Sequence, residues 1–144
     1  MIESCRFSIH DMSWVALDPT PPQTPRFNMP FELGLSVLHA MRAPTRRTWF
    51  VFESTSWRLQ KSLSDLNGTD PYIHDDTVEG VFRELAKAFV SSGRQPSVAQ
   101  MHTMYKTLEK NMPRILSDAA ARDPFSARAF KDIVVFCTAL AQNI

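Results

Sequence analysis

The sequence predicts an α/β fold in which a small parallel sheet is followed by an all-helical C-terminal tail. Two segments carry strand signals: residues 3–10, and the aromatic and β-branched residues 48–53. Between them, residues 26–41 carry the start signals of a helix. Strands separated by a helix favour a parallel sheet, and from residue 76 onward mainly helical patterns follow.

Composition narrows the classes of function. The chain has 144 residues, and its 16 Lys+Arg against 15 Asp+Glu leave a formal charge of +1. This even balance argues against a nucleic-acid-binding or membrane-surface protein. Hydrophobic residues make up 44% of the chain and charged residues 22%, which is typical of a globular protein. Because there are only 4 Gly and no GxGxxG or GxxxxGK[ST] motif, a glycine-rich phosphate loop is excluded.

Cysteine and histidine usage predicts a cytoplasmic protein with no metal site. Cys5 and Cys137 lie far apart in the sequence, and free thiols in a reducing compartment are the simplest interpretation. The histidines show no metal-ligand spacing with one another or with a cysteine. They are His10, His39, His74 and His102. The longest uncharged apolar run, residues 133–141, is far shorter than the about 20 residues that cross a bilayer.

The first predicted strand ends in a polar segment and a proline-rich loop. Phe7 and Ile9 share one face of this strand, and Asp11 and Ser13 follow at its end. Residues 18–25 then predict a surface loop, because proline fits neither a helix interior nor a central strand.

The predicted helix 26–41 is apolar on several sides, so we expect it to be mostly buried. Asn28 is the expected cap, which places Glu32 in the first turn. The polar residues of the helix form one narrow stripe: Glu32, Ser36 and His39. Gly34 costs about 1 kcal/mol relative to alanine in a helix, and close backbone packing is the usual reason to tolerate it.

The remaining predicted elements are a turn at residues 67–68, a short strand near 72–74 and three helices, the last of which begins at Asp123. Capping boxes are expected at Asp76 and at Ser97, and Pro113 should kink or restart the helix that contains it. We divide the chain into an α/β portion, residues 1–95, and a helical extension packed on it, residues 96–144.

A ligand site is predicted where the first strand ends and the next helix begins. In an open parallel sheet, ligands bind at the carboxyl ends of strands and at the adjoining helix N-termini. Asp11 and Ser13 lie at such an end, while Arg26, Asn28 and Glu32 lie at the start of the helix. Arg26 is suited to hold a phosphate or a carboxylate.

The residues of this predicted site resemble those of a known group of proteins. The segments IHDMS (residues 9–13) and RFNMPFELGL (residues 26–35) resemble the bacterial TIR-like and nucleoside deoxyribosyltransferase-like group. In that group, a strand ending in Asp precedes a helix with an N-x-x-[FY]-E-[LI]-G signature. WFVFES (49–54) and SDLNGTDPYIHD (64–75) are similar to the group's next strand and loop. The resemblance implies a partial flavodoxin/TIR-like parallel sheet that lacks the two strand–helix units with which such proteins usually begin.

The resemblance also implies an activity and roles for three residues, beside which the candidates Ser13 and Arg26 lie. Glu32 matches the Glu that handles the ribose at an N-glycosidic bond in NAD or a nucleoside. Asp11 matches the acid at the strand end, and Asn28 matches the residue that opens the helix. Ser13 and Arg26 would line the same site. The implied protein binds or hydrolyses an NAD-like nucleotide or a nucleoside in bacterial defence or signalling, with no separate cofactor.

Alternatives remain open at each of these positions. Glu32 could simply complement the helix dipole, and Asp11 and Ser13 could be ordinary turn residues. Arg26 could be one more surface cation. The alternative function is a non-catalytic interaction or regulatory module with a degenerate site.

The first strand further predicts self-association. If units before it are lacking, its edge and the apolar Phe7 and Ile9 have nothing to cover them, and such an edge is a template for another chain. We therefore expect a homo-oligomer that forms through the first strand, the helix with Glu32 or the tail helices.

Overall fold

Three parallel strands form the sheet, and the predicted α/β class is confirmed. The strands are β1 (Phe7–Asp11), β2 (Thr48–Glu53) and β3 (Tyr72–Ile73), in the spatial order β1-β2-β3. Both pairs are parallel; Ser8 lies opposite Trp49, and Glu53 lies opposite Ile73. β1 is therefore an edge strand of the sheet that the described residues form.

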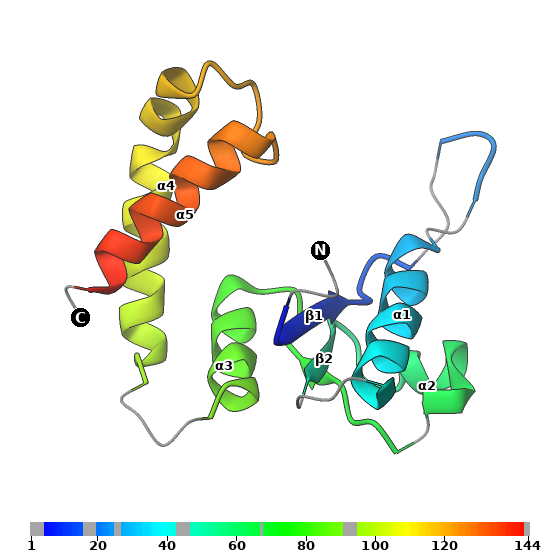
Figure 1. The fold of residues 1–144 in the computed structure, drawn as a ribbon. Helices are drawn as coiled ribbons and strands as arrows, with labels where there is room; N and C mark the ends of the chain where they lie inside the picture. Colours follow the sequence, from blue (N-terminus) through cyan, green and yellow to red (C-terminus); the bar gives the residue numbers. More distant parts are fainter. Residues whose placement is uncertain are drawn as a thin grey trace. The chain divides into compact units, whose positions relative to one another are not determined.

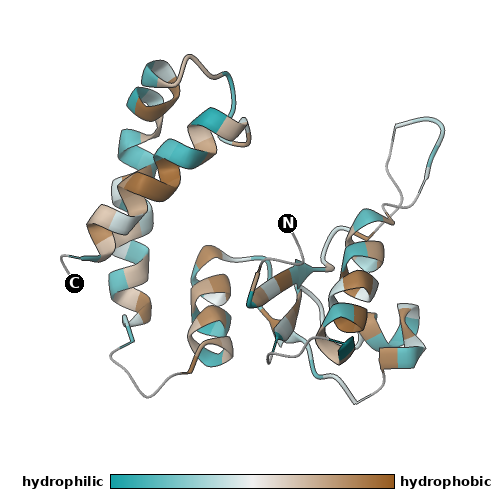
Figure 2. Cartoon of the chain, viewed as in Figure 1, coloured by the Kyte–Doolittle hydropathy of each residue, from teal (hydrophilic) through white to brown (hydrophobic). Residues whose placement is uncertain are grey.

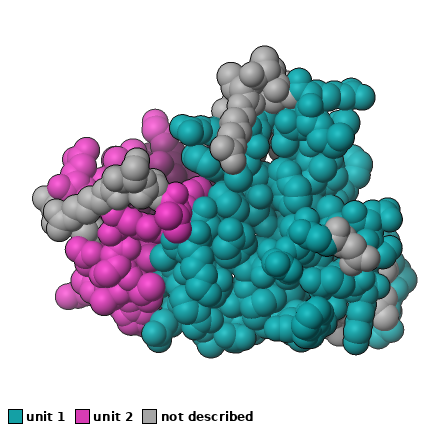
Figure 3. Space-filling model, turned by 90° about the horizontal axis from the view of Figure 1, so that it is seen from below, with its two compact units in different colours: residues 1–88 teal, residues 89–144 magenta. Residues whose placement is uncertain are grey.

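The computed structural model describes residues 5–15, 20–24, 27–42, 47–66, 68–90 and 95–142. The chain divides into two compact units, Met1–Ala88 and Phe89–Ile144, which are coloured separately in Figure 3. Unit 1 holds the sheet and the helices α1 (Asn28–Arg42), α2 (Arg58–Ser62), η2 (Ser64–Leu66) and α3 (Val78–Ala88). Unit 2 holds α4 (Val98–Asp118) and α5 (Ala127–Ala141). None of the described helices is long and apolar enough to span a bilayer.

The two faces of the sheet are covered differently, with α1 on one side of the strands and α3 on the other (Figure 1). On the α1 side the core consists of Met12, Leu33, Val51 and Leu59, all nearly inaccessible to solvent. Leu59 comes from α2, so this five-residue helix is held by tertiary burial rather than by its own propensity.

Aromatic rings line the opposite face of the sheet. Phe7 stacks on Phe50 with ring centroids 6.3 Å apart, and Tyr72 contacts both Phe50 and Phe52 at 5.9 and 5.3 Å. Phe50 and Phe52 are buried, whereas Phe7 and Ile9 on the edge strand stay partly exposed. The apolar edge predicted for β1 is therefore present within the described residues.

α1 differs from its prediction in two ways. The amide N–H of Phe31 donates to the carbonyl of Phe27, so the helix begins at Asn28 and Asn28 is its first residue rather than its cap. Glu32 consequently lies in the second turn, and the first-turn position expected for it is wrong. The expectation that α1 is mostly buried is also wrong, since only Leu33 and Ser36 are buried.

Of the two predicted capping boxes, one is confirmed. Ser97 Oγ accepts from the Gln100 amide at 3.2 Å, and Gln100 Oε1 accepts from the Ser97 amide at 2.8 Å. The box at Asp76 is wrong, because Thr77 caps α3 instead and its Oγ1 accepts from the Gly80 amide at 2.9 Å.

Unit 2 is a pair of packed helices. α4 and α5 lie side by side (Figure 1), and Ile115, Ala119 and Ala129 are their buried residues. Pro113 does not restart the helix, because α4 runs on to Asp118. α5 begins at Ala127 with Ser126 as its cap, a little later than Asp123 suggested.

Candidate functional site

The carboxyl ends of the three strands bring polar side chains from distant parts of the sequence to one edge of the sheet. β1 ends at Asp11 and β2 at Glu53, and His74 directly follows β3. Because the strands are parallel, these ends lie at the same edge, where open α/β sheets bind ligands. The candidate site is built on this edge and on the start of α1.

Asp11, Ser13 and His74 form a hydrogen-bonded cluster at this edge. The Ser13 amide donates to Asp11 Oδ1 at 2.9 Å, so the carboxylate shapes the turn that follows β1. Ser13 Oγ lies 2.9 Å from His74 Nε2, and the same nitrogen lies 3.5 Å from Asp11 Oδ1. Ser13 and His74 are buried, whereas the Asp11 side chain is about half exposed. The cluster therefore ties the end of β1 to the end of β3 through Asp11 Oδ1, while the Asp11 side chain stays about half exposed.

The tautomer of neutral His74 follows from its other hydrogen bond. The Asp76 amide donates to His74 Nδ1 at 3.2 Å, so that nitrogen carries no proton. Nε2 therefore carries the proton and donates to Ser13 Oγ. A histidine in this state cannot take the proton of the serine hydroxyl, and a serine-nucleophile mechanism requires that step. The cluster positions groups and does not form a hydrolase triad.

Glu53 and Arg58 form a second cluster, which ties β2 to the loop after β1. The Glu53 side chain is 1% exposed and accepts from the Ser54 amide at 2.7 Å and from Arg58 Nε at 3.0 Å. Arg58 Nη2 also bonds the other Glu53 oxygen and donates to the Ser13 carbonyl at 2.6 Å. A buried carboxylate needs such a partner, because an unpaired charge in the interior is strongly destabilising. Glu53 is therefore occupied by structural contacts.

Glu32 is the carboxylate at this edge that structural contacts leave unused. It is half-buried, and it makes no hydrogen bond or ion pair with any residue that the structure describes. The charge of Glu32 affects the pKa of His10. This histidine lies on the α1 side of β1 and is 3% exposed. Burial lowers the pKa of His10 below its ordinary value, and the negative charge of Glu32 partly opposes this by raising it.

Two of the three other glutamates in the described helices provide a contrast, whereas the third, Glu79 on α3, is exposed and makes no ion pair with a described residue. Glu84 on α3 accepts from Arg83 and Lys87, and Glu109 on α4 accepts from Lys106. Ion pairs of this kind stabilise helices, so these carboxylates have a structural role. No comparable contact among the described residues accounts for Glu32.

The predicted site residues are only partly brought together. Asp11 and Ser13 are in direct contact, and the charge of Glu32 acts on His10, whose pKa it raises. Within the described chain, no hydrogen bond or ion pair joins Glu32 to Asp11 or Ser13. Asn28 is exposed at the start of α1, and Arg26 lies outside the described residues.

His74 and Glu53 were missed by sequence reasoning, although a signal for them exists. The rule that selected Asp11 is that the residue ending a parallel strand reaches the ligand-binding edge. Glu53 ends the strongest predicted strand, and His74 follows the short one. The same rule, extended from the first strand to all three, would have found both residues.

Backbone strain gathers at the same edge. Trp57, Asp75 and Asp76 adopt positive φ angles of 68°, 53° and 54°, in the loops that leave β2 and β3. A bulky residue such as tryptophan is a true outlier in this region. Strained residues persist where the surrounding structure holds them, and they cluster at ligand sites.

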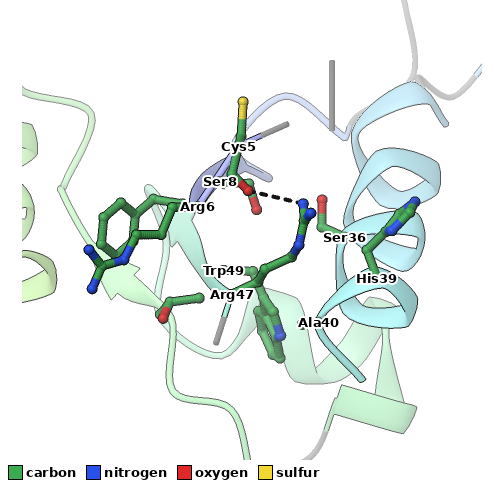
Figure 4. A pocket seen from close by; sticks show the side chains of 10 residues that line it. Cys5, Arg6, Ser8, Ser36, His39, Ala40, Arg47 and Trp49 are labelled. Atoms are coloured by element: carbon green, nitrogen blue, oxygen red, sulfur yellow. Dashed lines mark hydrogen bonds between the residues drawn. The ribbon is translucent and has the colours of Figure 1, made fainter. Parts of the chain in front are cut away.

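A small, partly open pocket lies at the other end of the sheet. It has a volume of about 10 Å³ and is lined by residues of β1, α1 and the start of β2, including Ser8, Ser36 and His39 (Figure 4). Ser36 points from α1 toward Arg47, whose Nη1 donates to the Cys5 carbonyl at 3.2 Å. The pocket has room for about one water molecule, so it is not the ligand site.

The described parts of the chain contain no group of three or more His, Cys, Asp or Glu side chains that could hold a metal ion. No family model, curated protein or solved structure matches the chain.

Proposed function

We propose that the carboxyl edge of unit 1 binds an NAD-like nucleotide or a nucleoside and that Glu32 faces the ribose at its N-glycosidic bond. One observation carries the proposal: Glu32 is a half-buried carboxylate beside the ligand-binding edge with no structural partner among the described residues. Glu53, Glu84 and Glu109 pair with cations, and Glu79 has no described partner but is exposed, whereas Glu32 is half-buried without a partner among the described residues.

The chemistry of N-glycosides requires a carboxylate of this kind. When the bond between ribose and base breaks, positive charge develops on the sugar, as in the oxocarbenium-like transition states of glycosidases. A carboxylate stabilises that charge or attacks the sugar carbon. Burial lowers the pKa of His10, which favours its neutral form, and a neutral imidazole does not cancel the charge of Glu32.

The other predicted site residues have roles that follow from their positions. The half-exposed carboxylate of Asp11 would accept a hydrogen bond from a ribose hydroxyl, as acids at such sheet edges do. The first turn of α1 contains no acidic residue, so its free amides, with Asn28, suit a phosphate. Arg26, which lies outside the described residues, would add a positive charge for the same group. Ser13 and His74 hold Asp11 in place. The two free cysteines, Cys5 and Cys137, support a cytoplasmic location.

The test is base release from NAD and from nucleosides, followed by chromatography. Wild type should release base, and Glu32→Gln should reduce the rate by at least about a hundredfold, since it removes the charge that acts in the transition state. Glu79→Gln is the matched control, because Glu79 is an exposed glutamate on α3 that likewise has no partner among the described residues. Equal rates for wild type and Glu32→Gln would contradict the proposal.

A second candidate is a non-catalytic interaction module, and one observation favours it. Large apolar side chains are exposed on both units, among them Phe31 on α1 and Phe130 on α5. Figure 2 shows such apolar positions on both helices. A groove of about 310 Å³ in unit 2, beside Met104 and Leu140, could take an apolar side chain of a partner. This reading predicts that Glu32→Gln changes nothing and that substitutions in the apolar surfaces do.

A further inference from the structure

An apolar stripe runs along the outward side of α1. Its members are Phe27, Phe31, Gly34, Leu38 and Met41, and we call them the outer stripe. The four large side chains are 67%, 68%, 42% and 80% exposed. They point away from the buried positions of α1, which face the core. A helix with apolar residues on opposite sides is normally covered on both.

The spacing of the outer stripe keeps its members on one face of α1. The positions alternate by four and three residues, as the residues along one face of a helix do. A second helix packed along α1 would meet the whole stripe, because the same repeat forms helix–helix packing seams.

Gly34 marks the point of closest approach. A Cβ atom at this position would meet nothing within 4 Å in the described structure, so no contact of this kind explains the glycine. Glycine inside a helix costs about 1 kcal/mol relative to alanine. A small residue between large apolar ones lets a second helix backbone approach closely, which offsets this cost.

We propose that the outer stripe is the contact surface of a homodimer, in which α1 packs antiparallel on α1 of a second copy with the two Gly34 residues at the crossing point. The stripe is self-complementary about Gly34, as a two-fold contact requires. Two phenylalanines precede Gly34, and a leucine and a methionine follow it. In the antiparallel arrangement the aromatic rings of one copy meet the aliphatic side chains of the other.

The outer stripe offers a small contact area for this dimer. A phenylalanine buries about 150 to 250 Å², so the two aromatic and two aliphatic side chains offer roughly 500 Å² on each copy. A total of about 1,000 Å² is typical of a weak, reversible association. The dimer should therefore form and dissociate with protein concentration.

The test is sedimentation velocity of the full chain over a hundredfold concentration range that reaches about 500 µM. Wild type should shift from monomer to dimer. Phe31→Asp should weaken the dimer by at least about tenfold, because it puts a charge in the contact. Gly34→Leu should weaken it similarly by filling the crossing point, while far-UV circular dichroism stays unchanged because the monomer has open space there.

Phe130→Asp is the matched control, since Phe130 is an exposed phenylalanine on α5 and should leave the dimer intact. A wild type that stays monomeric over the whole range would overturn the proposal. So would a dimer that survives both α1 substitutions, including one that only Phe130→Asp dissociates. The measurement requires no nucleotide, so its outcome is independent of the proposed ligand.

Discussion

At the scale of single residues, His10 links the proposed site to stability. It is buried between β1 and α1, with Nε2 near Ser8 Oγ at 3.1 Å and with a buried Nδ1 that has no hydrogen-bond partner. An imidazole in this position stays neutral more readily than an exposed one, which is why its pKa is lowered. His10 is also the histidine whose pKa responds to the charge of Glu32, the carboxylate on which the proposed chemistry depends.

The pH dependence of folding should therefore report on His10. A group whose pKa is lower in the folded than in the unfolded chain stabilises the fold above its unfolded pKa of about 6.5. That stabilisation is lost as the pH falls through the folded pKa, because the unfolded chain takes up the proton first. Urea unfolding at pH 7.5 and pH 5 should show wild type losing more stability on acidification than His10→Gln does. His102→Gln, at an exposed position, should behave like wild type; equal losses for all three would contradict this account.

At the scale of elements, the sequence predicted correctly those helices and strands that are stabilised by contacts within their own segment. β2 and the Ser97 capping box were correct, because an aromatic, β-branched run and a Ser-x-x-Gln motif act within their own segments. α2 was missed, because its five residues depend on the burial of Leu59 and on the Arg58–Glu53 pair. The α3 cap was assigned to Asp76 rather than Thr77, because the left-handed turn at Asp75 and Asp76 displaces the helix start.

The close contact between Gly80 on α3 and the end of β3 can be tested by substitution. A Cβ atom on Gly80 would lie 1.9 Å from the His74 carbonyl oxygen, so the helix cannot keep its place if that atom is added. Gly80→Ala should lower the free energy of unfolding by at least about 2 kcal/mol, the usual cost of overpacking. Gly34→Ala, measured by tryptophan fluorescence in dilute solution where the monomer prevails, should instead raise it by up to about 1 kcal/mol. If Gly80→Ala were neutral, the close contact between α3 and His74 would be wrong.

At the scale of the whole molecule, the sequence predicts the class of fold and part of the candidate site. Parallel connectivity places every strand end at one edge, which is why Asp11 and Ser13 could be selected from sequence. The roles of His74 and Glu53 depend on partners 61 and 5 residues away, and on the tautomer of an imidazole, which no spacing rule supplies. Glu32 differs from the other described glutamates because Glu53, Glu84 and Glu109 pair with cations and Glu79 is exposed, and neither property can be read from spacing in the sequence.

The measurement that tests the central claim most directly is a titration of the ¹⁵N-labelled protein with nicotinamide riboside or NAD, followed through its amide resonances. The account predicts saturable shifts at Asp11, Ser13 and the first two turns of α1, and their loss or marked weakening in Glu32→Gln but not in Glu79→Gln. No shift at high ligand concentration, or shifts confined to α4 and α5, would contradict the assignment of the ligand site to the carboxyl edge of the sheet.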